Sequence, residues 1–314
     1  MDRLAAIAEV IGIDIGGTGI KLGRFDDRGT CQQSLTIDTP QPATPEAVVA
    51  AVADAIATLD PQQECLAIGI GVPGPVDKSG KISRIAINLS NWTDVPLAPW
   101  LEEAIGRPVI LENDANCAGL GEFWIGAGRA YQDMLLLTLG TGVGGAIILN
   151  GELFTGRHGT AGELGLMTVE MYGHACNSGN RGSLEQQISI PAVRRRSKLD
   201  PHELGHLAES GNRQALEFWQ NYGHRLGAGL ANLIYIFTPE AIVIGGGISK
   251  SFPFFISATL TEVEQRVLPT SREGLQILAA ELGNQAGMVG AAKLAWKLPM
   301  VTLPKVAEQS DEIC

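Results

Sequence analysis

The chain contains the same short pattern twice: an apolar run, a glycine turn and a second apolar run. The first copy covers residues 10–25, with its glycines at 16–19, and the second covers residues 134–149, with its glycines at 140–145. Apolar runs of this length that are bounded by glycines predict β-hairpins. Two halves that open with the same hairpin indicate a duplicated fold, which strongly limits the architectures open to the chain.

Helices alternate with strands after the first hairpin. Residues 44–46, Thr-Pro-Glu, supply an N-cap, a first-turn proline and an early acidic residue, and apolar residues then recur at helical spacing as far as Leu59. Strands are predicted at residues 66–72 and 109–111, with a helix at about residues 98–104 between them. Because strands that alternate with helices pair in parallel, we expect an α/β protein.

The second half combines helices with a long polar segment. Asp200 and Asn212 are typical N-cap residues, and each predicts the start of a helix. Residues 156–189 are rich in glycine and polar side chains without periodicity, which predicts loops around a functional site. A buried strand is expected at residues 241–244 and a last helix at residues 290–298.

Composition and charge narrow the class of protein and its partners. With 45% hydrophobic and 18% charged residues, the 314-residue chain is an ordinary globular protein of about two domains rather than a disordered or fibrous one. Its net charge of −11 disfavours nucleic acid or a membrane surface as a partner, because both are anionic. The one basic cluster, Arg194 to Arg196 with Lys198, is interpreted as solvated surface.

Cysteine usage and the N-terminal residues indicate the compartment. The five cysteines are widely spaced and do not form the pattern of a disulfide framework. Residues 1–9 are too few and too charged for a signal peptide, and the longest apolar stretch, residues 134–149, is too short and glycine-rich to span a membrane. We therefore expect a cytoplasmic protein.

A carboxylate follows directly on the predicted strand at residues 109–111. In α/β sheets, ligands bind in the crevice beyond the carboxyl ends of the strands, which makes Asp114 a candidate for chemistry. The alternative is that Asn113 and Asp114 only cap the helix that starts near Ala115. This stretch alone leaves both interpretations open, and the glycine turns on either side of it favour the chemical one.

The glycine turn at residues 140–145 has the spacing G-x-G-x-x-G of a dinucleotide site. A dinucleotide loop runs from a strand into a helix, whereas this one runs into the apolar strand at residues 146–149. The turn is therefore interpreted as a glycine hairpin whose backbone N–H groups can approach a phosphate. A plain hairpin explains either turn alone, but it explains poorly why both carry threonine among the glycines.

Five motifs of this chain resemble those of the ROK family of sugar kinases, in the family's order. They are DIGGTGIK from Asp14, ENDAN from Glu112, LGTGVGG from Leu139, IVIGGGI from Ile242 and GMVGAA from Gly287. The resemblance implies the actin-like, ribonuclease-H-type α/β fold, in which two lobes flank a cleft, and a homodimer as the usual state. The lobes are expected at residues 1–112, completed by the helix at about 289–298, and at residues 113–288. A polar tail at residues 299–314 is expected to be poorly ordered.

The resemblance also implies roles for individual residues. Asp114 matches the general base that takes the proton of a sugar hydroxyl as it attacks the γ-phosphate of ATP. Asp14 matches the residue that organises Mg²⁺ through water. The residues that match sugar-binding positions are Asn113, Asp114, Glu163 and Glu185, with Asn88 as a further pocket residue. The residues that match nucleotide-binding positions are Asp14, Gly16, Gly17, Thr18, Lys21, Gly140, Thr141, Gly142, Gly144, Gly145 and Gly246.

One departure from the family's pattern concerns a metal. The family often has G-E-x-G-H followed by C-x-C-G-x-x-G-C, whose histidine and three cysteines bind a structural zinc. Here Leu166, Ser178 and Ser183 occupy three of those four positions, and none is a normal zinc ligand. We therefore predict that zinc is absent and that ordinary hydrogen bonds hold this loop. An alternative set of ligands consists of His158, His174 and Cys176.

The predicted function is the ATP- and Mg²⁺-dependent phosphorylation of a hexose at its 6-hydroxyl, with glucose as the expected substrate. Because the family histidine that contacts the sugar is Leu166 here, fructose, mannose, allose and N-acetylhexosamines stay open as alternative substrates. A non-catalytic sugar sensor is the rival from another class. A ROK repressor is not expected, because only about ten residues precede the first strand and a DNA-binding domain does not fit there.

Overall fold

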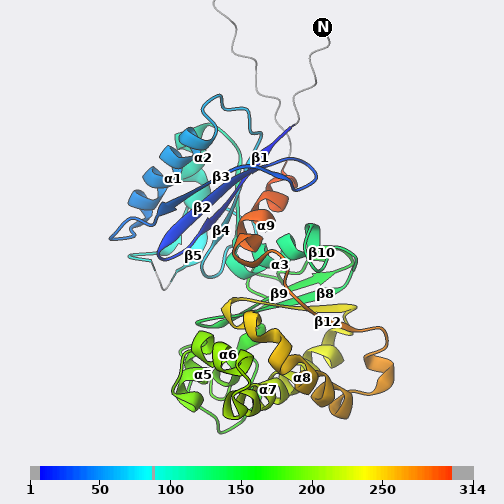
Figure 1. Ribbon diagram of the computed structural model, residues 1–314. Helices are drawn as coiled ribbons and strands as arrows, with labels where there is room; N and C mark the ends of the chain where they lie inside the picture. The colour runs from blue at the N-terminus through cyan, green and yellow to red at the C-terminus, as the bar shows by residue number, and fades with distance from the viewer. Residues whose placement is uncertain (1–7, 87–88, 299–314) are drawn as a thin grey trace, which may run out of the picture.

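The computed structural model describes residues 8–86 and 89–298, which form two five-stranded sheets with helices around them (Figure 1). Asn88, a predicted pocket residue, and residues 299–314, predicted to be a poorly ordered tail, lie outside the described residues. Within the described ranges, no helix combines the length and the apolar character needed to cross a membrane.

The first sheet has the strand order β3-β2-β1-β4-β7. Its strands are β1 (Val10–Ile15), β2 (Gly19–Phe25), β3 (Cys31–Asp38), β4 (Ile68–Val72) and β7 (Val109–Asn113). The strands β1, β2 and β3 form the predicted antiparallel meander, whereas β4 runs parallel to β1 and β7 parallel to β4. The other elements of this lobe are α1 (Pro45–Leu59), α2 (Leu97–Ile105) and the hairpin of β5 (Ser83–Ile85) and β6 (Thr93–Val95).

The second sheet repeats this arrangement, with the order β10-β9-β8-β11-β12. Its strands are β8 (Met134–Leu139), β9 (Val143–Leu149), β10 (Glu152–Leu153), β11 (Ala241–Gly245) and β12 (Gln276–Ala279). Here too three antiparallel strands are followed by two parallel ones. The duplicated fold inferred from the two hairpins is confirmed, and the chain has the two-lobed actin-like, ribonuclease-H-type α/β fold.

The glycine hairpin of the second lobe is shorter than the sequence predicted. Strand β9 begins at Val143 instead of Ala146, because Gly144 and Gly145 pair with Thr138 and Leu137 in the β8 ladder. The turn is therefore confined to residues 140–142. Glycine is disfavoured in strand interiors, which is why the pattern predicted a longer turn.

The helices of the second lobe surround its sheet and the loops next to it. They are α3 (Asp114–Trp124), α4 (Glu185–Ile188), α5 (Ile190–Ser197), α6 (Pro201–Glu209), α7 (Arg213–Phe237) and α8 (Phe252–Arg266), with short 3-10 turns η1 (Leu164–Leu166), η2 (Gly247–Ser251), η3 (Pro269–Ser271) and η4 (Gly283–Gln285). Asp200 caps α6 and Asn212 caps α7, as predicted. Trp219 and Tyr222 of α7 are fully buried and belong to the hydrophobic core of this lobe.

Helix α8 was not predicted, because its buried face carries few large apolar residues. Ala258 and Thr259 belong to that face, and the Thr259 hydroxyl donates to the carbonyl of Gly223 in α7. A Cβ at Gly223 would lie 2.3 Å from the carbonyl oxygen of Phe255, so the backbones of α7 and α8 are in close contact. Such close packing needs small side chains, and small side chains leave a weak periodic signal.

The basic cluster on α5 is only partly solvated, which corrects the prediction. Arg194 and Lys198 are exposed, but Arg195 and Arg196 are half-buried. Arg195 donates to the carbonyl of Gln186, and burial together with nearby arginines lowers the pKa of Arg196 to about 10.

Helix α9 (Ala286–Ala295) lies between the two lobes and packs beside α3 (Figure 1). It begins four residues before the predicted start at 290. A Cβ at Gly69 of β4 would lie 1.8 Å from the carbonyl oxygen of Ala291, and one at Gly290 would lie 1.7 Å from that of Cys117 in α3. Glycines at these contacts let the backbone of α9 rest directly on the first sheet and on α3.

Candidate active site

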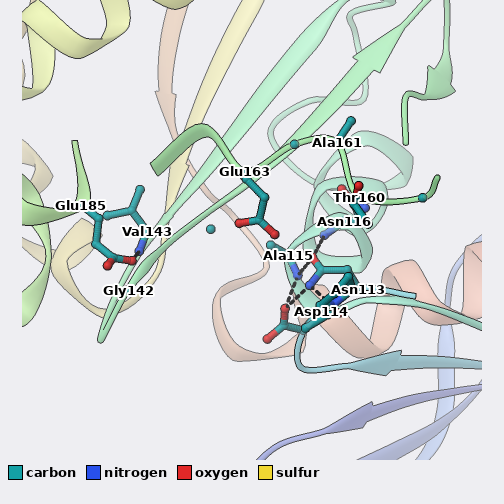
Figure 2. A pocket seen from close by; sticks show the side chains of 16 residues that line it. Asn113, Asp114, Ala115, Asn116, Gly142, Val143, Thr160, Ala161, Glu163 and Glu185 are labelled. Carbon is teal, nitrogen blue, oxygen red and sulfur yellow. Dashed lines mark hydrogen bonds between the residues drawn. The ribbon is translucent and has the colours of Figure 1, made fainter. Parts of the chain in front are cut away.

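A cavity of about 220 Å³ lies where the end of β7 and the start of α3 meet the β8–β9 hairpin (Figure 2). It is lined by residues 74–75, 113–116, 142–145, 159–163 and Glu185. The predicted residues that line it are Asn113, Asp114, Gly142, Gly144, Gly145, Glu163 and Glu185. Segments far apart in sequence thus bring three of the predicted carboxylates, those of Asp114, Glu163 and Glu185, to one site.

Asn113 is the N-cap of α3, so the capping alternative was right for this residue. Its Oδ1 accepts hydrogen bonds from the backbone N–H groups of Ala115 and Asn116, at 2.9 and 3.1 Å. Its Nδ2 donates to the carbonyl of Gly74 at 3.1 Å and to Oδ1 of Asp114 at 3.0 Å. One side chain therefore caps the helix and holds the neighbouring carboxylate.

Asp114 is the first residue of α3, and its carboxylate faces the cavity (Figure 2). Asp114 is exposed at the mouth of the cavity, although the protein groups packed around its carboxylate remove part of its hydration. This desolvation, together with the negative charges of Asp14 and Glu163, raises the pKa of Asp114 to about 6, against the opposing hydrogen bonds from Ala115 and Asn113. A carboxylate with that pKa is ionised at neutral pH and accepts a proton more readily than an ordinary aspartate.

Glu163 and Glu185 occupy the other side of the cavity. Glu163 immediately precedes η1, and Glu185 is the first residue of α4. Oε2 of Glu185 accepts the backbone N–H of Val143 at 3.0 Å, which ties α4 to the start of β9. Burial raises the pKa of Glu163, and the negative charge of Glu185 on the same cavity raises it further.

Asp14 lies near the end of β1, next to the start of α9. Alternation along the strand buries Ile13 and Ile15 in the core that contains α1 residues, and it turns Asp14 to the opposite face. There a Cβ at Gly287 would lie 3.1 Å from Cγ of Asp14. Burial raises the pKa of Asp14, and the ammonium group of Lys21, 3.6 Å from Oδ2, opposes this shift.

The predicted nucleotide-binding residues lie outside the cavity, apart from Gly142, Gly144 and Gly145. The β1–β2 turn is held by Thr39, whose hydroxyl donates to the carbonyl of Gly16 at 2.6 Å and whose N–H donates to Thr18 at 3.2 Å. The β8–β9 turn is held by the carbonyl of Gly140, which accepts the N–H of Ile190 at 2.8 Å. Gly246 follows β11 with φ of 83°, and a Cβ there would lie 2.5 Å from the backbone of Leu139.

Glu112 and Asn116 had no predicted role, although both belong to the ENDAN motif. Asn116 is 2% exposed, and its Nδ2 donates to Oε1 of Glu112 at 3.0 Å. The same oxygen accepts the N–H of Asn113 at 2.8 Å, and burial raises the pKa of Glu112. This pair supports the turn that presents Asp114. The sequence signal for this contact was the spacing of four residues between the two side chains at the start of a helix.

The loop after Glu163 carries one of the four ligands of the family's zinc pattern. Leu166, Ser178 and Ser183 occupy the positions at which the family pattern has ligands, and only Cys176 matches that pattern. Among residues 8–86 and 89–298, no group of three or more His, Cys, Asp or Glu side chains is placed to hold a metal ion. The alternative set of His158, His174 and Cys176 is therefore not assembled.

Comparison with known proteins relates this geometry to characterised families. The ROK family model matches residues 10–297. Glucokinase from Thermotoga maritima is 35% identical over 306 residues, which cover 91% of this chain and 96% of that protein. The crystal structure of a ROK family glucokinase from Streptomyces griseus, in complex with glucose and AMPPNP, has a TM-score of 0.80 and 34% identity, and the match covers 93% of this chain and 100% of that one. The xylose repressor of Bacillus spizizenii is 32% identical over 296 residues, covering 90% of this chain and 76% of the repressor.

Proposed function

Because the chain belongs to the ROK family, we propose that it transfers the γ-phosphoryl group of ATP to the 6-hydroxyl of a hexose, with glucose as the expected substrate. The observation that carries this proposal is the Asp114 carboxylate, which faces a cavity shared with Glu163 and Glu185. The glucokinase from Thermotoga maritima and the Streptomyces griseus structure with glucose and AMPPNP support both the reaction and the sugar.

In this proposal Asp114 is the general base. Its carboxylate takes the proton of the 6-hydroxyl while that oxygen attacks the γ-phosphorus, and ADP leaves from the opposite side. Asn113 holds Oδ1 of Asp114 at 3.0 Å, so the carboxylate is oriented before the sugar arrives. Positioning of the hydroxyl and the phosphate supplies most of the rate enhancement in such transfers.

The sugar is proposed to bind among the polar groups that line the cavity. The carboxylates of Asp114, Glu163 and Glu185 accept hydrogen bonds only, which suits a ligand rich in hydroxyl donors. Asn113 contributes an amide at the same wall.

The triphosphate is proposed to bind along the two glycine turns at the adjoining sheet edges. The residues assigned to it are Gly16, Gly17, Thr18, Lys21, Gly140, Thr141, Gly142, Gly144 and Gly145, with Gly246 against the adenosine. The carboxylate oxygens of Asp14 and its partly buried negative charge fit a hydrated Mg²⁺. When bound, this ion would neutralise charge on the phosphates. When Mg²⁺ is not bound, Lys21 would balance the charge of the Asp14 carboxylate.

A sugar sensor without catalysis is the second candidate, because a xylose repressor is among the relatives. The raised pKa of Asp114 and the two glycine turns favour the kinase, since a sensor needs neither. We also propose the homodimer that the family resemblance implies, which sedimentation of the purified protein would test.

We expect kcat/KM for the sugar to fall as the pH drops below about 6, by about tenfold per pH unit. The base must be ionised to accept a proton, and the raised pKa of Asp114 moves this loss well above the pH near 4 at which an ordinary aspartate titrates. A pH–rate profile measures it. Glu163→Gln removes one of the neighbouring negative charges and is expected to move the acidic limb to lower pH. An unperturbed limb near pH 4 would argue that Asp114 is not the base.

The direct test of the proposed function is ADP release with Mg²⁺-ATP across glucose, mannose, fructose, allose, N-acetylglucosamine and N-acetylmannosamine. Turnover led by glucose is the expected result. Turnover led by another sugar would keep the reaction and change the substrate. Tight binding of one sugar without ADP release would overturn the kinase and leave the sensor.

A further inference from the structure

The segment between Glu163 and Glu185 folds back on itself as an irregular hairpin. Thr168 forms a β-bridge with Ser183, and the backbone N–H of Leu184 donates to the carbonyl of Met167 at 2.8 Å. The two glutamates that line the cavity are thus the residues on either side of this hairpin. Whatever holds the hairpin closed also sets the separation of the two carboxylates.

A single asparagine connects the positions at which the family pattern has zinc ligands. Nδ2 of Asn180 donates to the carbonyl of Leu166 at 2.8 Å. The carbonyl of Asn180 accepts the N–H of Cys176 at 2.8 Å, and its own N–H donates to Oγ of Ser178 at 3.4 Å. Leu166, Cys176 and Ser178 are three of the four ligand positions, so Asn180 links the same parts of the loop that a metal ion would link.

The side chain of Asn180 has no unused polar atom. Its Nδ2 is 3.1 Å from Oγ1 of Thr168, and its Oδ1 is 3.2 Å from that hydroxyl and accepts the N–H of Arg181 at 2.7 Å. The amide is half-buried, where an unpaired donor or acceptor costs free energy, so the contacts support one another.

We infer that Asn180 is a positioning residue that takes the place of the structural metal, closing the 166–183 hairpin with hydrogen bonds and so holding Glu163 and Glu185 in place for the sugar. The inference rests on the proposed function for the role of the two glutamates. Glu163 and Glu185 line one cavity and carry like charges, so hydrogen bonds that close the hairpin help to keep both carboxylates facing it. In this chain the cross-link of the hairpin consists of side-chain and backbone hydrogen bonds.

The test compares Asn180→Ala with Asn177→Ala. Asn177 is exposed on the same loop, and its side chain makes no hydrogen bond to the rest of the described chain, so this variant is a matched control for the chemical change. We expect Asn180→Ala to raise both the hexose Kd, measured by calorimetry, and the hexose KM by about tenfold or more, with KM for ATP within about twofold of wild type. Equal hexose affinity in the two variants would overturn the inference.

A rescue experiment separates positioning from general damage to the fold. In the Asn180→Ala background, the substitutions Leu166→His, Ser178→Cys and Ser183→Cys rebuild the family's ligand set around Cys176. Added Zn²⁺ is expected to bind at one ion per chain and to bring the hexose Kd back toward that of wild type, relative to the same variant without zinc, in which the Leu166→His side chain is equally present. Zinc bound at full occupancy without recovery of the Kd would show that closing the hairpin is not what Asn180 does.

Hydrogen exchange tests the cross-link without any sugar. The amides of residues 168–184 are expected to exchange faster in Asn180→Ala and to keep wild-type rates in Asn177→Ala. Unchanged exchange in Asn180→Ala would contradict the cross-link itself. Failure of wild type to bind any hexose would instead contradict the proposed function, and the exchange result would still decide the role of Asn180.

Discussion

Replacing Asp114 with asparagine is expected to lower kcat by about 10²- to 10⁴-fold while the fold and the hexose Kd stay close to wild type. Asparagine has the same shape, and its Oδ1 can still accept the Ala115 N–H that Asp114 accepts at 2.8 Å. It cannot take a proton from a hydroxyl at neutral pH. The loss corresponds to about 3–5 kcal/mol of transition-state stabilisation.

The measurement is steady-state ADP release at saturating hexose and Mg²⁺-ATP, with the hexose Kd from calorimetry. Asp54→Asn makes the same chemical change at an exposed position of α1 and is expected to keep wild-type kcat. A kcat near wild type for Asp114→Asn would rule out Asp114 as the base. A large loss of hexose affinity with unchanged kcat would make it a sugar ligand only.

Replacing Gly69 with alanine is expected to cause a large loss of stability. The new Cβ would lie 1.8 Å from the carbonyl oxygen of Ala291 and 2.7 Å from its carbonyl carbon, so the backbone of α9 must move away from β4. Overpacking of this kind costs about 1–3 kcal/mol and more where backbone cannot yield, out of a total of about 5–15 kcal/mol. The same displacement moves Gly287, which faces Asp14, so KM for ATP is expected to rise as well.

Urea unfolding followed by circular dichroism measures the stability. Gly19→Ala is the matched control, because Gly19 also lies in a strand of the first sheet and its new Cβ would have an ordinary contact of 3.6 Å with Ile37. We expect the control to change the free energy of unfolding by no more than about 0.5 kcal/mol. Equal stability of the two variants would mean that α9 is not in close contact with the sheet in solution.

Features that depend on neighbours in sequence were predictable. Thr44, Asp200 and Asn212 cap the helices expected of them, because an N-cap needs only a short polar side chain and the N–H groups that follow it. The repeated hairpin indicated a duplicated fold, since strand and turn chemistry is local. Helix α8 and strand β12 were missed, because their positions depend on packing against elements far away in the chain.

At the functional site, too, some features were predictable from neighbouring residues and others depended on the tertiary structure. The position of Asp114 directly after a predicted strand made it a candidate, but the resemblance to a family was needed to identify Glu163 and Glu185 and to relate the three, because no local pattern tells which loops will meet. The raised pKa of Asp114 comes from burial and from the charges of Asp14 and Glu163, none of which is encoded in the residues adjacent to it in the chain.

The sequence by itself determined the two hairpins, the caps and the loss of three of the four zinc-ligand positions, because each depends on residue identity at nearby positions. Only the tertiary structure decided that Asn180 reaches the carbonyl of Leu166 and that the three carboxylates share one cavity. The physical reason is that hydrogen bonds and charge interactions act over a few ångströms in space, and the distance in space between two residues far apart in sequence is set by the packing of the whole fold.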